Sequence, residues 1–403
     1  MSKITSPIKY DKTLFMYAAS RALERAAYYG MRSIVAIYMF RGVLSFSEGD
    51  TMQLYGWLIQ GIVVAGVIGA LFGDFVLGNR KALLVGTVLM SIGLFLLCVP
   101  SKAAFYSAIG LIVMGNGLYT PNLLARFGKQ FYNKPELTDG GFSILYVLVN
   151  IGAFAGITIV GLFGYENYAL GFALSGILML GSAILSFLNK ETDSNQTPTV
   201  VTYNNSYSAL IILGTILATG LYWYLYDFSS NGLYYIQSKI AEFNTDLSPM
   251  RWQNLSTSLT VIIGIAVAVI YSFYCFGRTL KLALGFLLTA LALGIALFIS
   301  FPISLSGVGI MFLVVLLMSI AEMIMAPVVY GLITKRANPK YLALLISLTF
   351  VPFMIFKALM PYIIGETMTT ETKSLMIGAP LMAIMGIVAF VIWIVKKKQN
   401  PAA

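Results

Sequence analysis

Long apolar stretches, separated by short polar segments, recur along the whole chain. A helix needs about 20 mostly apolar residues to cross roughly 30 Å of hydrocarbon, and each stretch reaches about that length. Helices satisfy all backbone groups inside a bilayer without a closed barrel. The pattern therefore predicts an all-α membrane protein with 12 transmembrane helices. The predicted spans are 14–39, 51–73, 82–100, 104–124, 141–163, 167–189, 207–238, 252–275, 280–301, 305–334, 341–365 and 374–396.

The composition agrees with a membrane protein, because 59% of the 403 residues are hydrophobic and only 10% are charged. A full-length span follows a largely polar start, so we expect no cleavable signal segment. Cys98 and Cys275 fall in separate predicted spans and indicate neither a disulfide nor a metal site. The chain has no histidine, which leaves carboxylates to carry any proton near neutral pH. We expect no metal and no cofactor, with the proton as the coupling ion.

The positive charge of the chain is a topology signal. The formal net charge is +10, but in a membrane protein the positions of Lys and Arg matter more than their sum. Of the 26 Lys and Arg residues, 17 fall on the terminal tails and even-numbered connections, and five on the odd-numbered connections. We therefore expect both termini in the cytoplasm and no nucleic-acid partner.

A polar segment at 190–206 separates six predicted spans from six. We expect an N-terminal six-helix bundle at 1–189, a cytoplasmic linker, and a C-terminal six-helix bundle at 207–403. A faint internal repeat supports this division. It places Asp74, Arg80 and Lys81 after the second span, and Arg278 and Lys281 after the eighth. Six spans plus six resemble the plan of major facilitator transporters. The loop after the second span either steadies the inward gate through charge pairing at a helix end or contacts the substrate directly.

Seven charged residues remain inside predicted spans. Ionised side chains facing lipid cost about 3 kcal/mol each on insertion scales, or on the order of 20 kcal/mol for the set. They are therefore expected to face one another or a water-filled cavity. The seven are Arg21, Glu24, Arg25, Arg32, Asp227, Glu322 and Lys357.

The first span carries one polar stripe. Arg21, Glu24, Arg25, Tyr28 and Arg32 fall within about one third of the helix circumference at 100° per residue. A stripe near mid-membrane favours a substrate path, and a buried structural ion-pair ladder is the alternative. Arg32 approaches the outer interface, where snorkelling is a third interpretation.

The seventh and tenth spans carry acidic residues at membrane depth. Asp227 follows a cluster of aromatic residues and precedes the polar stretch 229–232, which we expect to loosen the helix. Glu322 lies five residues before Pro327, and the proline favours a kink because it removes one backbone donor. Both carboxylates are candidate functional groups.

The order of these residues resembles the signatures of the proton-dependent oligopeptide transporters, a family of the major facilitator superfamily. The first-helix signature E-x-x-E-R-F-x-Y-Y-G is matched by Glu24, Arg25, Tyr28, Tyr29 and Gly30. Further matches are Gly115, Gly117, Pro121 and Asn122 on the fourth helix, Asp139, Phe142, Tyr146, Asn150, Gly152, Ala153 and Phe154 on the fifth, Trp223 and Asp227 on the seventh, and Glu322, Pro327, Thr334, Lys335 and Lys357 on the tenth and eleventh.

The chain departs from the family pattern, which makes it an atypical member. Arg21 replaces the first Glu, Thr120 replaces the fourth-helix Lys, Ala26 replaces the Phe, and Ala326 replaces the Ser before the proline. The linker is also too short for the two extra helices that bacterial members usually carry. The first two changes leave the first-half cavity with one surplus positive charge. Either nearby positive charge keeps Glu24 ionised and Asp227 and Glu322 carry the coupling proton, or Arg21 only supplies the cation that the fourth helix has lost and coupling through Glu24 is kept.

The resemblance implies a secondary active transporter that moves di- and tripeptides across the bacterial inner membrane by alternating access, coupled to protons. It assigns substrate binding to Arg21, Arg25, Tyr28, Tyr29, Asn150, Trp223, Tyr226 and Glu322. It assigns proton coupling to Glu24, Asp227 and Glu322, and gating or structural roles to Asp74, Arg80, Lys81, Pro327 and Lys357. An Arg25–Asp227 ion pair is expected when no substrate is bound.

Two other functions compete with peptide transport. The same fold could move another small polar or anionic metabolite as a proton-independent facilitator. A membrane enzyme or receptor is disfavoured, since the sequence has no catalytic pattern of carboxylates or nucleophiles, no phosphate loop and no sizeable soluble domain. The expected partners are a small-molecule substrate and membrane lipids, with no obligate protein partner.

Overall fold

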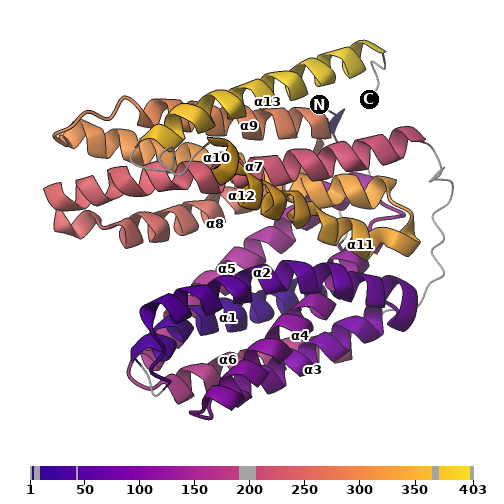
Figure 1. The fold of residues 1–403 in the computed structure, drawn as a ribbon. Coiled ribbons are helices and arrows are strands. Elements are labelled where there is room, and N and C mark those ends of the chain that lie inside the picture. The colour runs from indigo at the N-terminus through magenta and orange to yellow at the C-terminus, as the bar shows by residue number, and fades with distance from the viewer. Residues whose placement is uncertain (1, 4–9, 42–43, 190–205, 365–371, 400–403) are drawn as a thin grey trace. The chain divides into compact units, whose positions relative to one another are not determined.

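The computed structural model describes residues 2–3, 10–41, 44–189, 206–364 and 372–399. Nearly all of these residues are helical, and Figure 1 shows the long helices with their labels. They are α1 (Lys12–Arg41), α2 (Glu48–Phe72), α3 (Asn79–Leu96), α4 (Lys102–Lys129), α5 (Thr138–Gly164), α6 (Tyr168–Leu188), α7 (Ser206–Phe243), α8 (Pro249–Phe273), α9 (Arg278–Ala296), α10 (Leu305–Arg336), α12 (Val351–Ile364) and α13 (Lys373–Gln399). A short helix, α11 (Leu342–Ser347), precedes α12.

Eleven helical segments of the described chain are long and apolar enough to cross a membrane. The chain is thus a helical multi-pass membrane protein, as the apolar pattern predicts. α1 also has 30 residues, but the charged stripe interrupts its apolar surface, and it is not one of the eleven. The exact count of 12 spans and the cytoplasmic location of the termini stay predictions.

The eleventh predicted span, 341–365, corresponds to the helical segment Pro339–Met360, in which a single 3₁₀ turn at Leu348–Phe350 lies between α11 and α12. One detail of the predicted helices is wrong. The polar stretch 229–232 does not interrupt α7, which continues through it. Here the Gly232 amide donates a hydrogen bond of 3.0 Å to Ser374 Oγ on α13, so a neighbouring helix supports the polar stretch.

The chain forms two compact units. The N-terminal unit comprises Lys9–Ala209 together with Ile333–Leu348, and the C-terminal unit comprises Met1–Ile8, Leu210–Leu332 and Thr349–Ala403. The predicted linker 190–206 lies outside the described residues except at its last position. The predicted bundles at 1–189 and 207–403 stay predictions.

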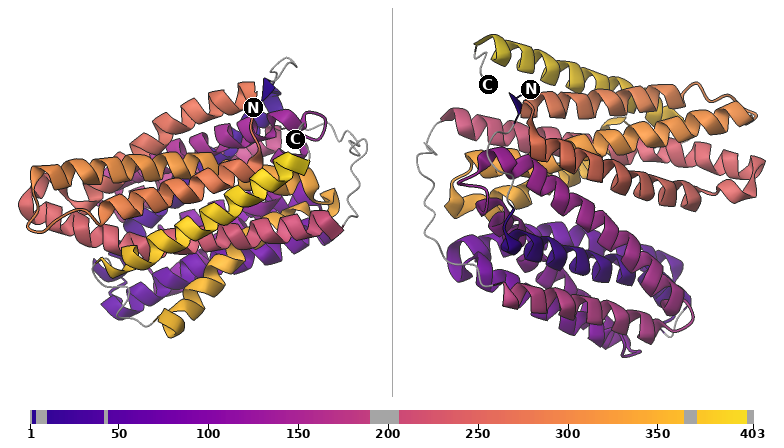
Figure 2. Two further views of the ribbon diagram at one scale, coloured as in Figure 1. Left: turned by 90° about the horizontal axis from the view of Figure 1, so that it is seen from above. Right: turned by 180° about the vertical axis from the view of Figure 1, so that it is seen from behind.

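The N-terminal unit is built on close contacts between helices at small residues. α1 packs against α5 and α6, and α4 packs against α2 and α3 (Figure 2). Gly152 and Gly156, one turn apart on α5, lie so close to α1 that an added Cβ would collide with the carbonyl oxygens of Ala22 and Ala26. Such small-xxx-small patterns let helices approach closely in a membrane. Because Ala26 is buried at this crossing, a small residue here suits the close approach that positions the stripe of α1.

In the C-terminal unit, α9 and α13 lie side by side (Figure 2). Two short strands, β1 (Ser2–Lys3) and β2 (Tyr274–Cys275), pair antiparallel, with Ser2 opposite Cys275 and Lys3 opposite Tyr274. α7 packs closely on α12, where a Cβ on Gly220 would meet Pro352 at 2.5 Å. This contact and the Gly232–Ser374 hydrogen bond fix the middle of α7 from two sides.

Candidate functional site

Glu24 is the centre of a buried ion cluster on α1. Its side chain is 0% exposed, and its two oxygens accept hydrogen bonds from both neighbouring arginines. Arg21 Nη1 lies 2.7 Å from Oε2, while Arg25 Nε and Nη2 lie 2.7 Å from Oε2 and 2.6 Å from Oε1. The predicted stripe therefore brings these three residues together, as the spacing on one helix face indicates.

α4 completes the cluster with two polar side chains. Asn116 Nδ2 donates to Glu24 Oε1 over 2.9 Å, and Arg21 Nη1 donates to Thr120 Oγ1 over 2.8 Å. Thr120 Oγ1 in turn donates to Asn116 Oδ1 over 3.0 Å. Two guanidinium groups thus share one carboxylate, and these five side chains carry one surplus positive charge. Such a cluster can bind an anionic group by charge-assisted hydrogen bonds.

A network of buried hydroxyl groups supports the cluster from behind. Ser20 Oγ lies within 2.9 Å of Tyr119 Oη and Ser182 Oγ and within 2.8 Å of Ser186 Oγ. The ring of Tyr119 lies 5.7 Å from the guanidinium carbon of Arg21. The network joins α1, α4 and α6 and keeps every one of these buried hydroxyls hydrogen-bonded, which low-dielectric surroundings require.

Tyrosine rings continue the stripe along α1. The guanidinium of Arg25 lies over the rings of Tyr28 and Tyr29, at 4.8 and 5.6 Å from their centroids. Arg32 lies near the same two rings, and its Nε and Nη2 donate to Tyr55 Oη on α2 over 3.0 and 2.8 Å. A neighbouring helix therefore holds the guanidinium of Arg32, and snorkelling of this residue stays a hypothesis.

Asn150, a predicted substrate-binding residue, lies on α5. Its Nδ2 donates to the carbonyl of Tyr146 one turn earlier, over 2.9 Å. The side chain is half-buried, and its role in binding stays a prediction.

In the C-terminal unit, aromatic residues of α7 gather near a carboxylate of α10. The Trp223 ring lies 5.6 Å from that of Tyr226 and 5.5 Å from that of Tyr222. Glu322 on α10 is close enough to act electrostatically on both tyrosines. The structure thus brings together Trp223, Tyr226 and Glu322, all three predicted to bind substrate. Pro327 lies within the continuous helix α10, five residues beyond Glu322.

Asp227 forms an ion pair within the C-terminal unit. Its Oδ2 lies 2.8 Å from Lys357 Nζ on α12. Lys357 is thus placed beside a predicted proton-coupling residue. The predicted Arg25–Asp227 pair would join residues of different units and stays a prediction.

A second polar cluster surrounds Asp74, in the π-helical turn Gly73–Leu77. Its Oδ1 accepts from Asn79 Nδ2 over 2.8 Å, and its Oδ2 accepts from the Leu344 amide of α11 over 2.9 Å. Lys129 Nζ donates to Asn79 Oδ1 over 2.7 Å. Arg80 and Lys81, also predicted gate residues, lie in the first turn of α3. This arrangement ties α11 to the N-terminal unit.

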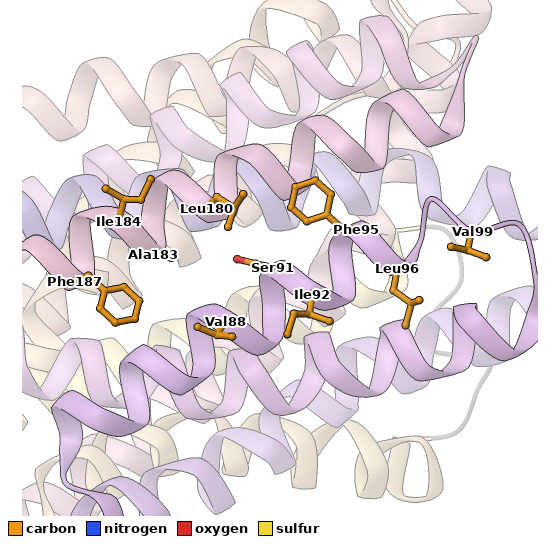
Figure 3. A pocket seen from close by; sticks show the side chains of 10 residues that line it. All are labelled: Val88, Ser91, Ile92, Phe95, Leu96, Val99, Leu180, Ala183, Ile184 and Phe187. Atoms are coloured by element: carbon orange, nitrogen blue, oxygen red, sulfur yellow. The ribbon is translucent and has the colours of Figure 1, made fainter.

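A groove of about 610 Å³ lies between α3 and α6 (Figure 3). Its lining is apolar apart from Ser91, whose hydroxyl donates to the Thr87 carbonyl over 2.8 Å. None of the predicted site residues lines it. A polar substrate would find no hydrogen-bonding partner here, so the groove is not the substrate site. Within the described residues, no cluster of three His, Cys, Asp or Glu side chains could hold a metal ion.

The sequence matches a known family over part of its length. Residues 80–199 match the POT family. The match covers α3 to α6, and the fold and the α1 cluster are consistent with it.

Two curated relatives of the chain are named as transport proteins. The uncharacterized transporter YclF of Bacillus subtilis (strain 168) is 32% identical over 191 residues, which cover 45% of this chain and 38% of that protein. The dipeptide and tripeptide permease B of Aliivibrio fischeri (strain MJ11) is 30% identical over 207 residues, which cover 49% and 40%. The match thus spans about two fifths of the length of these relatives.

Solved structures share the fold over nearly the whole chain. A mutant of a peptide transporter POT has a TM-score of 0.64 and 20% identity, covering 95% of this chain and 94% of the other. A POT family transporter in complex with 5-aminolevulinic acid has a TM-score of 0.64 and 18% identity, covering 94% and 95%. These relatives and neighbours are transporters and not enzymes, in agreement with the sequence prediction.

Sequence reasoning missed two members of the α1 site. Asn116, which bonds Glu24, lies between the two glycines of the fourth-helix match, and Tyr55, which bonds Arg32, lies near the start of α2. A polar amide at mid-span with a threonine one turn later was the available signal for Asn116. No comparable signal marked Tyr55, because tyrosines near span ends are common interface anchors.

Proposed function

We propose that the chain transports short peptides, chiefly di- and tripeptides, across the bacterial inner membrane by alternating access. The observation that carries this proposal is the Arg21–Glu24–Arg25 cluster, in which two guanidinium groups share one buried carboxylate. The surplus positive charge suits the carboxylate terminus of a peptide. Tyr28 and Tyr29 flank Arg25 and offer hydroxyl groups to the peptide backbone.

The acidic residues of the C-terminal unit provide the opposite pole. Glu322 and Asp227 would bind the amino terminus, while Trp223 and Tyr226 would contact variable side chains. Aromatic and apolar surfaces with a few charged groups are typical of sites that take ligands with a common backbone and different side chains. Both termini of the substrate would therefore matter for transport.

We infer that the proton is the coupling ion, with Asp227 and Glu322 as the principal carriers. Glu24 accepts four hydrogen bonds from Arg21, Arg25 and Asn116, and protonation would weaken this set. Glu24 therefore serves mainly to hold the two arginines in place. Asp227, with a half-exposed side chain, is better placed to exchange a proton with water.

A second candidate function is the transport of a smaller zwitterion or anion. The cationic cluster would bind any carboxylate, and one structural neighbour is a POT family transporter in complex with 5-aminolevulinic acid, which has an amino group and a carboxylate but no peptide bond. Binding of such a ligand in preference to dipeptides would favour this candidate, and transport indifferent to a proton gradient would make the protein a facilitator.

Thermal stabilisation of the purified protein tests the proposal. Ala-Ala and Ala-Ala-Ala should raise the melting temperature, and a dipeptide blocked at either terminus should do so much less. Free amino acids, 5-aminolevulinic acid and dicarboxylates form the comparison set. Equal stabilisation by doubly blocked peptides would refute the two-pole site, and preference for the comparison set would replace peptides as the substrate class.

A further inference from the structure

The helices that carry Asp227 and Lys357 are packed together rigidly one and two turns before the ion pair. A Cβ on Gly220 of α7 would meet Pro352 at 2.5 Å and the amide nitrogen of Phe353 at 2.8 Å. One turn later, the ring of Tyr224 lies 6.0 Å from that of Phe356 on α12. Residues 220, 224 and 227 share one face of α7, so the same contact face continues to Asp227. The two helices are therefore in close contact directly before the ion pair.

The ion pair itself is open. The side chains of Lys357 and Asp227 are 57% and 46% exposed, in contrast to the fully buried Glu24. A lysine ammonium is a compact charge on a flexible four-carbon stem, and a half-exposed pair of this kind is weak. Lys357 can therefore leave Asp227 by side-chain rotation, without any movement of α7 or α12.

The ammonium group of Lys357 resembles the amino terminus of a peptide substrate. The Lys357 ammonium and the amino terminus of a peptide are both primary ammonium groups, with three N–H donors each. The 2.8 Å contact therefore places a primary ammonium on Asp227 Oδ2. Building on the proposed function, we propose that Lys357 is an internal competitor for Asp227, which the substrate ammonium displaces on binding. In this role Lys357 is a specificity-determining residue, in addition to the gating or structural role that the sequence predicts.

Competition between Lys357 and the substrate predicts the direction in which the Kd for Ala-Ala changes when Lys357 is replaced. Lys357→Met should tighten binding of Ala-Ala, because the substrate no longer displaces a lysine and no longer meets its positive charge. The expected gain is about two- to fivefold in Kd, the range for a weak ion pair. Lys357→Arg keeps the competing cation and should bind Ala-Ala as the unmutated protein does. N-acetyl-Ala-Ala has no ammonium, so its weaker Kd should be the same in all three proteins.

Calorimetric titration of the purified full chain with both probes decides the question. Lys239→Met is the matched control, because Lys239 pairs with Glu242 of the same helix at 2.8 Å and not with Asp227. This variant should leave both Kd values unchanged. In the Asp227→Asn background, Lys357→Met should lose its effect on Ala-Ala. A purely structural Lys357 would instead give a lower melting temperature and equal changes for both probes, which would overturn the proposal.

The outcomes also separate this proposal from the proposed function. Binding of Ala-Ala by the unmutated protein, with no change in Lys357→Met, would overturn the competition alone. If neither the unmutated protein nor Lys357→Met bound either probe, peptide transport and the competition would both be refuted.

Discussion

Arg21 Nη1 on α1 donates a 2.8 Å hydrogen bond to Thr120 Oγ1 on α4, the position where the POT signature has a lysine. The same nitrogen lies 2.7 Å from Glu24 Oε2. The guanidinium therefore stands where a fourth-helix lysine would reach the carboxylate. Arg21 thus supplies from α1 the cation that the fourth helix lacks, and variants of the three carboxylates test separately which of them carries the proton.

The first prediction concerns this relocated charge. Arg21→Gln should lower dipeptide uptake into proteoliposomes at least about tenfold, because hydrogen bonds to charged groups contribute about 1.5–3 kcal/mol each. The double change Arg21→Glu with Thr120→Lys recreates the family arrangement and should recover much of the uptake that Arg21→Glu alone loses. Thr120→Val keeps every charge and serves as the control, with a small effect. If the double variant took up no more dipeptide than Arg21→Glu at an equal amount of protein, the proposal that Arg21 replaces the fourth-helix lysine would be refuted.

The second prediction concerns Glu24 as a structural anchor. Glu24→Gln leaves two buried guanidinium groups without their carboxylate, and breaking a buried ion pair in this way typically costs about 3–5 kcal/mol. We expect a clear fall in the melting temperature of the purified protein. Glu242→Gln, on an exposed pair with Lys239, should leave it almost unchanged. A Glu24→Gln protein as stable as the parent would show that the cluster does not support the fold.

Features with a local signal could be predicted from the sequence. The apolar length that a membrane demands located the helices well, for example 104–124 inside the observed α4. The spacing of charges also placed Arg21, Glu24 and Arg25 on one face, where they meet. Both signals lie within one helix.

Features that depend on tertiary contacts could not be predicted in this way. Asn116 meets Glu24 across 92 residues and Lys357 meets Asp227 across 130, and no local period encodes such partners. The grouping of Ile333–Leu348 with the N-terminal unit rests on long-range contacts of the same kind. The polar linker can be recognised in the sequence. The hydrogen bond from the Leu344 amide to Asp74 forms only in the folded chain, so the sequence gives no sign of it.

The third prediction concerns this attachment. Asp74→Ala removes the acceptor of the Leu344 amide, and amide exchange in α11 should become about tenfold faster, as expected for loss of a charge-assisted hydrogen bond. Hydrogen–deuterium exchange read by mass spectrometry on the peptide containing 342–347 measures it. Asp50→Ala is the matched control, because Asp50 bonds Ser47 at the start of α2 and loses the same charge. Unchanged protection of α11 in Asp74→Ala would contradict the attachment.

The fourth prediction assigns the coupling groups. Glu24 is held by four hydrogen bonds from charged or amide donors, whereas Asp227 has a half-exposed side chain and Glu322 lies among tyrosines. Asp227→Asn or Glu322→Gln should therefore abolish gradient-driven accumulation of dipeptide in proteoliposomes. Because both carboxylates are also proposed to bind the substrate ammonium, downhill exchange should fall only as far as the weaker binding requires and should not be lost. Glu24→Gln, measured on the fraction that stays folded, should lower both processes alike. Accumulation that survived both C-terminal changes but disappeared selectively in Glu24→Gln would move the coupling group to α1, since only the group that carries the proton separates driven from downhill transport.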